Sequence, residues 1–424
     1  MKRIKAPGRE LRGDFLWNMA GNLMFAAHSV LMLAFVSRFA GVESAGIFSL
    51  VYSVAQMLYL ISCFELINVL ITDSGGTIGF RETVVFRILT NGAMVVCAAV
   101  FAWAQGFTGL KAQAFWLLIG YMVLLSFAEL SECQLHHRGY LRLSGKSLAL
   151  DIGLCSLVFA LMLMLTGSML PAIGAMCAVI LLWILFFDLP HLRATRSGEA
   201  QRKIRWNQLG MLVSLCLPLV CMRLIVSYVI NSPKLAIDAF LTLRDQSVYG
   251  YMLMPASCIN LLNLFVLRPS LPRLAQFYNE GQDRAFLRVV GFLVGWNVLV
   301  TVCVLAGGWV LGIPVLSLFY GVDLQGFRGL LCLCLLGGCF YSFATLFDAV
   351  ATAMRCHRWN LFVYLPALLA GFTMTYSLVR RLGLRGAALS YVLLMAILAA
   401  GSGIVLTIFF LRHRRAALAQ EADI

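Results

Sequence analysis

Apolar residues follow one another in runs of roughly 20 from Phe15 to Leu411, and only short polar stretches separate these runs. A helix needs about 20 residues to cross a hydrocarbon core about 30 Å thick. The strands of a membrane barrel would instead alternate apolar and polar residues over segments of about ten. The pattern therefore predicts an all-α polytopic membrane protein with twelve spans, at residues 15–38, 46–70, 86–104, 113–133, 148–168, 171–188, 208–230, 249–267, 287–310, 328–348, 360–379 and 386–411.

Composition supports this prediction. Hydrophobic residues make up 61% of the chain and charged residues 12%, with a mean hydropathy of +0.88. An ordinary globular domain is about half apolar and about a quarter charged. Residues 148–188 would be far too long as one span, so a turn is expected near Gly167 to Pro171. The first apolar run has full spanning length and no small-residue cleavage site after it, which predicts a retained helix rather than a signal peptide.

The basic residues predict the orientation. With the N-terminus inside, 24 of the 33 lysines and arginines fall on the cytoplasmic side, 8 fall on the opposite side, and Arg223 is embedded. Short loops rich in Lys and Arg stay in the cytoplasm, so both termini are expected there. The net charge of +14 then reflects topology and attraction to anionic membrane lipids. Nucleic acid is not an expected partner.

The chain contains a repeat. The string WNMAG at residues 17–21 returns as WNQLG at residues 206–210, and the segment at 46–60 lines up with that at 250–264. Gly21 and Gly210 are expected to permit close helix approach. The offset grows from 189 to 204 residues, which predicts about fifteen extra residues in an external loop around 231–249. Two six-helix lobes related by a pseudo-twofold axis along the membrane normal are the simplest account.

The predicted domain boundaries follow from the repeat. A cytoplasmic N-terminus at 1–14 precedes an N-terminal lobe at 15–188, and a basic cytoplasmic linker at 189–207 leads to a C-terminal lobe at 208–411. A cytoplasmic tail at 412–424 ends the chain. Pro255 is expected to bend span eight, and Pro269 and Pro272 are expected to end it.

These features resemble a known family. The six-plus-six spans, the basic N-terminus before Trp-Asn, the string SAGIFSLVYSVAQMLYLI and the string RPSLPRLAQFYNEGQDRAFLR are similar to those of polysaccharide (O-antigen-type) flippases of the multidrug/oligosaccharidyl-lipid/polysaccharide (MOP) exporter superfamily. The resemblance implies a V-shaped, MATE-like transporter with a cavity between its lobes, lined chiefly by spans one, two, seven and eight. Its substrate would be a polyprenyl-diphosphate-linked oligosaccharide, carried across the bacterial cytoplasmic membrane by alternating access. A polysaccharide polymerase and glycosyltransferases are the partner enzymes implied.

Polar stripes on these spans are candidate substrate contacts. At 100° per residue, three polar residues of span one fall within about 40° of one another, and span two carries a comparable stripe. Each small polar group could equally serve as an interhelical hydrogen-bond contact. The candidates are Asn18, Asn22 and Ser29 in span one, Ser53 and Gln56 in span two, and their counterparts Ser257 and Asn260 in span eight.

Embedded ionisable residues give a sharper signal, because a charge at mid-membrane is costly and faces a cavity or a partner. Arg223 lies near the middle of span seven, and either Glu65 or the substrate could be its partner. His28, near the middle of span one, is a substrate-cavity candidate or a neutral histidine satisfied by a neighbouring helix. Glu65 could bind a coupling ion or a proton, or could pair with Arg223.

Charge balance separates the candidate functions. A MATE-type cation or drug antiporter needs carboxylates in its lobes, whereas an arginine offers donors to the phosphates of a lipid-linked glycan. A membrane glycosyltransferase or polymerase would need a large external loop with catalytic acids, and the segment 231–249 offers two, Asp238 and Asp245. The remaining acids near the inner ends, such as Glu129, Glu132, Asp151 and Asp348, are expected to be solvated or paired. No metal ligand set assembles around His136–His137 or Cys332-x-Cys334, and no cofactor is expected.

Overall fold

The computed structural model describes residues 11–67, 70, 79–195, 205–354 and 356–422. Every predicted span coincides with helix in this part of the chain. Ten of these helices are long and apolar enough to cross a membrane, and the two bent parts of a further one pass the same test together. The prediction of an all-α polytopic membrane protein is confirmed.

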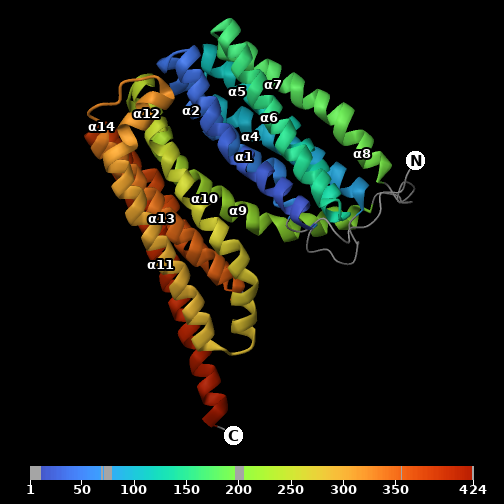
Figure 1. The fold of residues 1–424 in the computed structure, drawn as a ribbon, viewed down its shortest axis with the longest axis vertical. Coiled ribbons are helices and arrows are strands. Elements are labelled where there is room, and N and C mark those ends of the chain that lie inside the picture. The colour runs from blue at the N-terminus through green and yellow to red at the C-terminus, as the bar shows by residue number, and fades with distance from the viewer. Residues whose placement is uncertain (1–10, 68–69, 71–78, 196–204, 355, 423–424) are drawn as a thin grey trace. The chain divides into compact units, whose positions relative to one another are not determined.

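The chain divides into two compact units, Met1–Leu224 and Ile225–Ile424. Their boundary falls inside the helix Trp206–Phe240, which is labelled α9 in Figure 1. The predicted division at the linker 189–207 stays a prediction, and most of that linker lies outside the described residues.

Unit 1 is a helical bundle in which α1 packs along α6, α2 packs against α4 and α5, and α7 packs against α5 and α6 (Figure 1). The predicted turn at Gly167 is present, because this glycine ends α6 with a left-handed φ of 62°. The helices are α1 (Leu11–Phe39), α2 (Val42–Cys63), α4 (Phe80–Ala104), α5 (Gly109–His137), α6 (Leu141–Thr166) and α7 (Met169–Trp183), the last continuing through a π-helical turn (Ile184–Asp188) into α8 (Leu189–Ala194).

Glycine brings α1 and α6 close together. A Cβ atom added to Gly145 of α6 would lie 2.7 Å from the backbone nitrogen of Asn18, and one added to Gly21 of α1 would lie 3.1 Å from Leu148 Cβ. Small residues at a membrane helix interface permit this approach. The repeat does not reproduce this contact, because no atom of the described residues lies within 4 Å of a Cβ added to Gly210. The prediction of close packing is right for Gly21 and wrong for Gly210.

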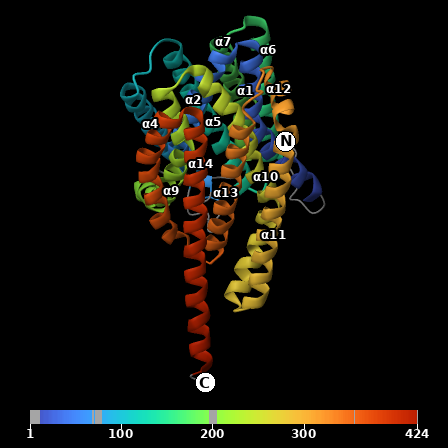
Figure 2. The same cartoon turned by 90° about the vertical axis from the view of Figure 1, so that its left-hand side faces the viewer.

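Unit 2 has a core of apolar side chains from α10, α11, α13 and α14, including Leu274, Phe286 and Val350. Gly383, at φ 59° and ψ −137°, divides α14 at the predicted break between the last two spans. Figure 2 shows the end of α14 continuing past the turn between α10 and α11. The helices are α10 (Leu243–Asn279), α11 (Asp283–Gly307), α12 (Ile313–Tyr320), α13 (Arg328–Ala353) and α14 (Leu361–Ala422), with a π-helical turn (Gly308–Gly312) before α12 and a 3-10 turn (His357–Asn360) before α14.

The extra residues of the second half do not form a loop, so that prediction is wrong. Two residues separate α9 from α10, as two separate α1 from α2. The insertion instead lengthens α9, which ends 34 residues beyond Trp206, whereas α1 ends 22 residues beyond Trp17. Asp245, one of the two acids considered for catalysis, closes a capping box with Thr242 at the start of α10. The external catalytic loop that a glycosyltransferase would need is therefore not formed here.

The prolines of α10 act differently from the prediction. Pro269 and Pro272 lie inside the helix and do not end it. Its two parts, Leu243–Leu264 and Val266–Asn279, meet at an angle of 42°. Pro269 has no N–H to donate to the carbonyl of Phe265, four residues earlier, so a hydrogen bond is missing at the bend. The bend thus lies nearer to Pro269 than to Pro255, where it was expected.

Candidate functional site

A break in the backbone at the end of α2 forms the centre of the candidate site. The helix ends at Cys63, and Phe64 and Glu65 follow with φ angles of 49° and 53°. Neither residue is glycine, and a left-handed conformation costs roughly 1–2 kcal/mol for each such residue. Strain of this kind persists only where the surrounding structure fixes it.

The break directs Glu65 to Arg223. The Nε atom of Arg223 lies 3.0 Å from Oε1 of Glu65, and the side chains are 62% and 12% exposed respectively. The structure thus forms the pair that the sequence left as one of two alternatives. The two Nη nitrogens of Arg223 have no hydrogen bond to a described residue, so this largely exposed guanidinium retains donors for a further acceptor.

Apolar packing holds the first half of α9 beside the break. Leu209 and Leu212 of α9 belong to one buried cluster with Leu66, Leu70 and Phe86. All of these residues lie in unit 1, as Glu65 and Arg223 do. The position of Arg223 is therefore set by packing within a single unit.

A second ion pair, which is buried, stabilises the backbone break at the end of α2. Arg87 of α4 is 1% exposed, and its Nη2 lies 3.0 Å from Oε2 of Glu129 on α5. Its Nη1 donates to the carbonyl oxygen of Ser62 at 2.8 Å, and the hydroxyl of Thr90 donates to the same carbonyl at 2.8 Å. In a continuous helix this carbonyl would accept from Leu66, so Arg87 and Thr90 replace the helical donor that the break removes.

This support was missed from the sequence. No role was predicted for Arg87, and Glu129 was expected to be solvated or paired near the inner ends of the spans. Both lie on helices whose polar residues face each other, but that arrangement depends on how α4 and α5 pack. Asn91 of α4, which donates to the Ser126 hydroxyl of α5 at 2.9 Å, extends the same contact.

His28 lies in the interior of unit 1. It is 1% exposed, with Nδ1 2.7 Å from the Ser156 hydroxyl and Nε2 3.2 Å from the Tyr121 hydroxyl. The structure thus surrounds this ring with partners from α5 and α6, as the neutral-histidine alternative describes. It does not bring His28 to Arg223.

The other candidates of unit 1 lie on two helices. Asn22 is exposed and donates to the Asn18 carbonyl at 2.7 Å, and Ser29 is half-buried. On α2, the hydroxyl of Ser53 is buried and donates to the Ser49 carbonyl, whereas Gln56 is exposed. Asn22 and Gln56 are therefore the candidates that offer accessible polar groups.

In unit 2, Ser257 is exposed and donates to the Met254 carbonyl at 2.6 Å. Asn260 lines a small pocket with Asn263. Asp348 accepts hydrogen bonds from Asn360 and Tyr364 at 2.6 and 3.0 Å, so this acid is partnered as expected.

Several acids of unit 1 are more deeply buried than the sequence suggested. Glu132, Asp151 and Asp188 are 8%, 0% and 0% exposed, so the expectation of solvated charges is wrong for Glu132 and Asp151, and Asp188 carried no expectation. Asp188 accepts from the Ser147 hydroxyl at 2.7 Å, yet among the described residues its Oδ2 and that of Asp151 have no hydrogen-bond partner. These acids lie in predicted spans four, five and six, and only the packing of the helices buries them. Across the described residues, no three His, Cys, Asp or Glu side chains are grouped to hold a metal ion.

No protein-family model matches the sequence, and no curated protein matches it. Solved structures, in contrast, match the fold of this chain. One is an inward-facing multidrug-resistance MATE family transporter of the MOP superfamily, with a TM-score of 0.68 and 13% identity over 96% of this chain and 99% of that one. This chain has the MOP transporter fold.

Two further structures share this fold. An outward-facing MATE family transporter of the MOP superfamily has a TM-score of 0.63 and 13% identity, over 94% of this chain and 95% of that one. A MOP superfamily transporter from Pyrococcus furiosus has a TM-score of 0.58 and 15% identity, over 96% and 95%. It is described as having a binding pocket of reversed polarity that suggests a different function. At these identities the comparisons show the fold of the chain alone.

Proposed function

We propose that this MOP-fold chain is a flippase for a polyprenyl-diphosphate-linked oligosaccharide, working by alternating access in the cytoplasmic membrane. The observation that carries the proposal is Arg223, an embedded and largely exposed arginine whose Nε lies 3.0 Å from Oε1 of Glu65. A diphosphate supplies oxygen acceptors for the remaining Nη donors, and arginine matches their geometry in pairs. Inward- and outward-facing structures of other MOP-fold transporters support the alternating-access part of the proposal.

The polarity of the site also supports an anionic substrate. Glu65 is paired with Arg223, Glu129 is paired with Arg87, and Glu132, Asp151 and Asp188 are buried. The guanidinium is therefore the charged group that the site offers to a substrate. The P. furiosus transporter, with its reversed pocket polarity, is an example of a MOP transporter for which a different function is suggested.

Cation or drug antiport is the second candidate, because the buried Asp151 and Asp188 each keep a carboxyl oxygen that has no partner in the described part of the chain. Such groups could take up a proton or another cation. Both are 0% exposed, however, so an organic cation would have no access to them without rearrangement of the bundle.

Variants of the pair test the proposal. Arg223→Ala removes the ion pair of the mostly buried Glu65, so we expect lower protein abundance together with loss of transport. The double variant Glu65→Ala/Arg223→Ala also removes the carboxylate, and abundance should recover while transport stays absent. Charge-assisted hydrogen bonds contribute about 1.5–3 kcal/mol each, so binding of the diphosphate lipid should weaken about ten- to a hundredfold.

Arg223→Lys is the matched control, since it keeps the charge and loses the planar fork; partial transport is expected. Abundance is measured by immunoblot, and transport by the appearance of the glycan in the outer leaflet of proteoliposomes. Full recovery of transport in the double variant would limit Arg223 to a pairing role and contradict the proposal.

A further inference from the structure

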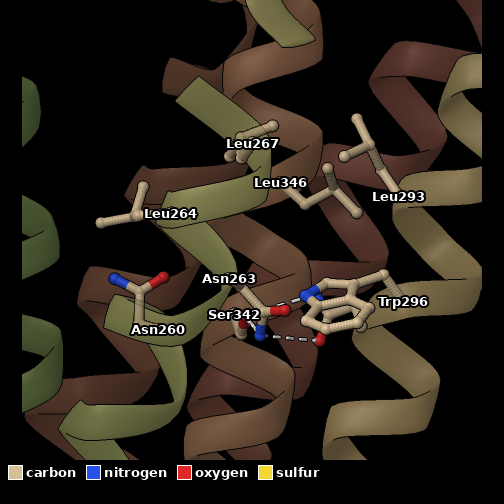
Figure 3. A pocket seen from close by; sticks show the side chains of 9 residues that line it. Asn260, Asn263, Leu264, Leu267, Leu293, Trp296, Ser342 and Leu346 are labelled. Atoms are coloured by element: carbon tan, nitrogen blue, oxygen red, sulfur yellow. Dashed lines mark hydrogen bonds between the residues drawn. The ribbon is translucent and has the colours of Figure 1, made fainter. Parts of the chain in front are cut away.

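A small polar pocket lies inside unit 2, where α10, α11 and α13 meet (Figure 3). The space open to the centre of a water molecule is about 10 Å³. A cavity needs roughly 10–15 Å³ by this measure to hold one water molecule, and the water needs two to four polar partners. The pocket therefore has room for a single oxygen atom and for no larger group.

The hydrogen bonds around the pocket use the amide nitrogens. Nδ2 of Asn263 donates to the Ser342 hydroxyl at 2.7 Å and to Oδ1 of Asn297 at 3.3 Å, while Nδ2 of Asn297 donates to Ser342 at 3.2 Å. Asn263, Asn297 and Ser342 are 7%, 1% and 1% exposed. This cluster fixes the amide of Asn263 and leaves its carbonyl oxygen for another donor.

Three buried atoms that line the pocket have no hydrogen-bond partner among the described residues. They are Oδ1 of Asn260, Oδ1 of Asn263 and Nε1 of Trp296. Two of them accept hydrogen bonds and one donates. Asn260 and Asn263 lie on α10, and Trp296 lies on α11, so the unmet donors and acceptors come from both helices (Figure 3).

Only some ligands fit this set. A cation would face the N–H of Trp296, an anion would face the amide oxygen of Asn263, and an apolar group would leave all three atoms unsatisfied. Figure 3 shows the amide of Asn260 turned away from Asn263 and Trp296, so it does not share a ligand with them. One water molecule can donate to Oδ1 of Asn263 and accept from Nε1 of Trp296. We propose that the pocket binds one water molecule, which joins α10 to α11 as a structural ligand.

The location gives this water a role. α10 bends by 42° between Leu264 and Val266, directly after Asn263, and Pro269 cannot supply the N–H for the Phe265 carbonyl. The bound water thus links the bent part of α10 to its neighbour, whichever substrate the protein carries.

Ultraviolet resonance Raman spectroscopy tests this proposal. The spectrum of the full-length protein minus that of Trp296→Phe isolates the indole N–H of Trp296, whose band reports hydrogen bonding. We expect a hydrogen-bonded indole. Asn263→Ser removes the amide oxygen to which the water donates, and it should shift the band toward a weaker bond. Asn260→Leu, at an amide turned away from the indole, is the matched control and should leave the band unchanged. Trp309→Phe, at a residue 55% exposed in the same unit, supplies the reference spectrum. A free N–H at Trp296 would overturn the proposal.

A second measurement needs no variant. Radiolytic labelling in ¹⁸O-enriched water marks side chains that lie beside bound water. Leu293, which lines the pocket, should be labelled, and Leu331, which is equally buried in the same unit without lining it, should not be. Equal labelling of the two leucines would contradict a bound water in this pocket.

Discussion

The buried pair of Arg87 and Glu129 gives the most quantitative prediction. Arg87→Met removes a guanidinium that is 1% exposed and leaves Glu129, 25% exposed, without its partner. Breaking a buried pair costs about 3–5 kcal/mol, and the partial exposure of Glu129 places the expected loss near the lower end. At roughly 2–4 °C for each kcal/mol in a unit of this size, the melting temperature should fall by roughly 6–12 °C.

Differential scanning fluorimetry on the intrinsic tryptophans of detergent-solubilised protein measures this change. Arg193→Met, at an exposed position of α8 in the same unit, is the control and should change stability by no more than about 0.5 kcal/mol. The double variant Arg87→Met/Glu129→Gln should melt above Arg87→Met, because no carboxylate is then stranded. If Arg87→Met and the wild type had the same melting temperature, the pair of Arg87 and Glu129 could not be what stabilises the break in α2.

Three further predictions concern packing, burial and topology. Gly145→Ala should destabilise the protein by about 1–3 kcal/mol, because its Cβ would clash with the α1 backbone. Gly92→Ala is the control and should be neutral or stabilising, because no described atom lies within 4 Å of the added Cβ. Equal melting temperatures for the two variants would refute the close contact of α1 and α6. Asp188→Asn removes a fully buried charge-bearing group and keeps an acceptor for Ser147, so it should melt at or above the wild type; a large fall would show that the carboxylate itself is required. A cysteine at Gln325 should react with an impermeant maleimide in intact cells and one at Gln282 only after permeabilisation, and the reverse result would invert the topology.

Hydropathy was sufficient to predict the helices, because a bilayer requires long apolar segments whatever their neighbours are. It was not sufficient to place the insertion in α9, since a helix can accommodate extra residues as well as a loop can. It was also not sufficient to place the bend in α10, because that helix contains three prolines. The repeated Trp-Asn motif shows the same limit. Gly21 packs closely against α6, whereas no described residue packs against Gly210, so a shared sequence motif does not ensure a shared helix contact.

The candidate site was predictable in part. Arg223 and Glu65 were found because charges inside apolar runs are rare. The left-handed break at Phe64 carries no sequence signature, because a glycine, the usual residue there, is absent. The burial of Arg87, Asp151 and Asp188 depends on contacts between helices far apart in the sequence, and these exist only once the bundle is packed.

Substrate choice by the purified protein tests the central claim most directly. Proteoliposomes that contain the wild-type chain are supplied in turn with a fluorescent polyprenyl-diphosphate glycan and with a cationic dye, and arrival in the opposite leaflet or lumen is measured. The account predicts translocation of the diphosphate lipid, its loss in Arg223→Ala, and no transport of the dye. Transport of the dye without movement of the lipid would contradict the flippase proposal and favour a cation antiporter.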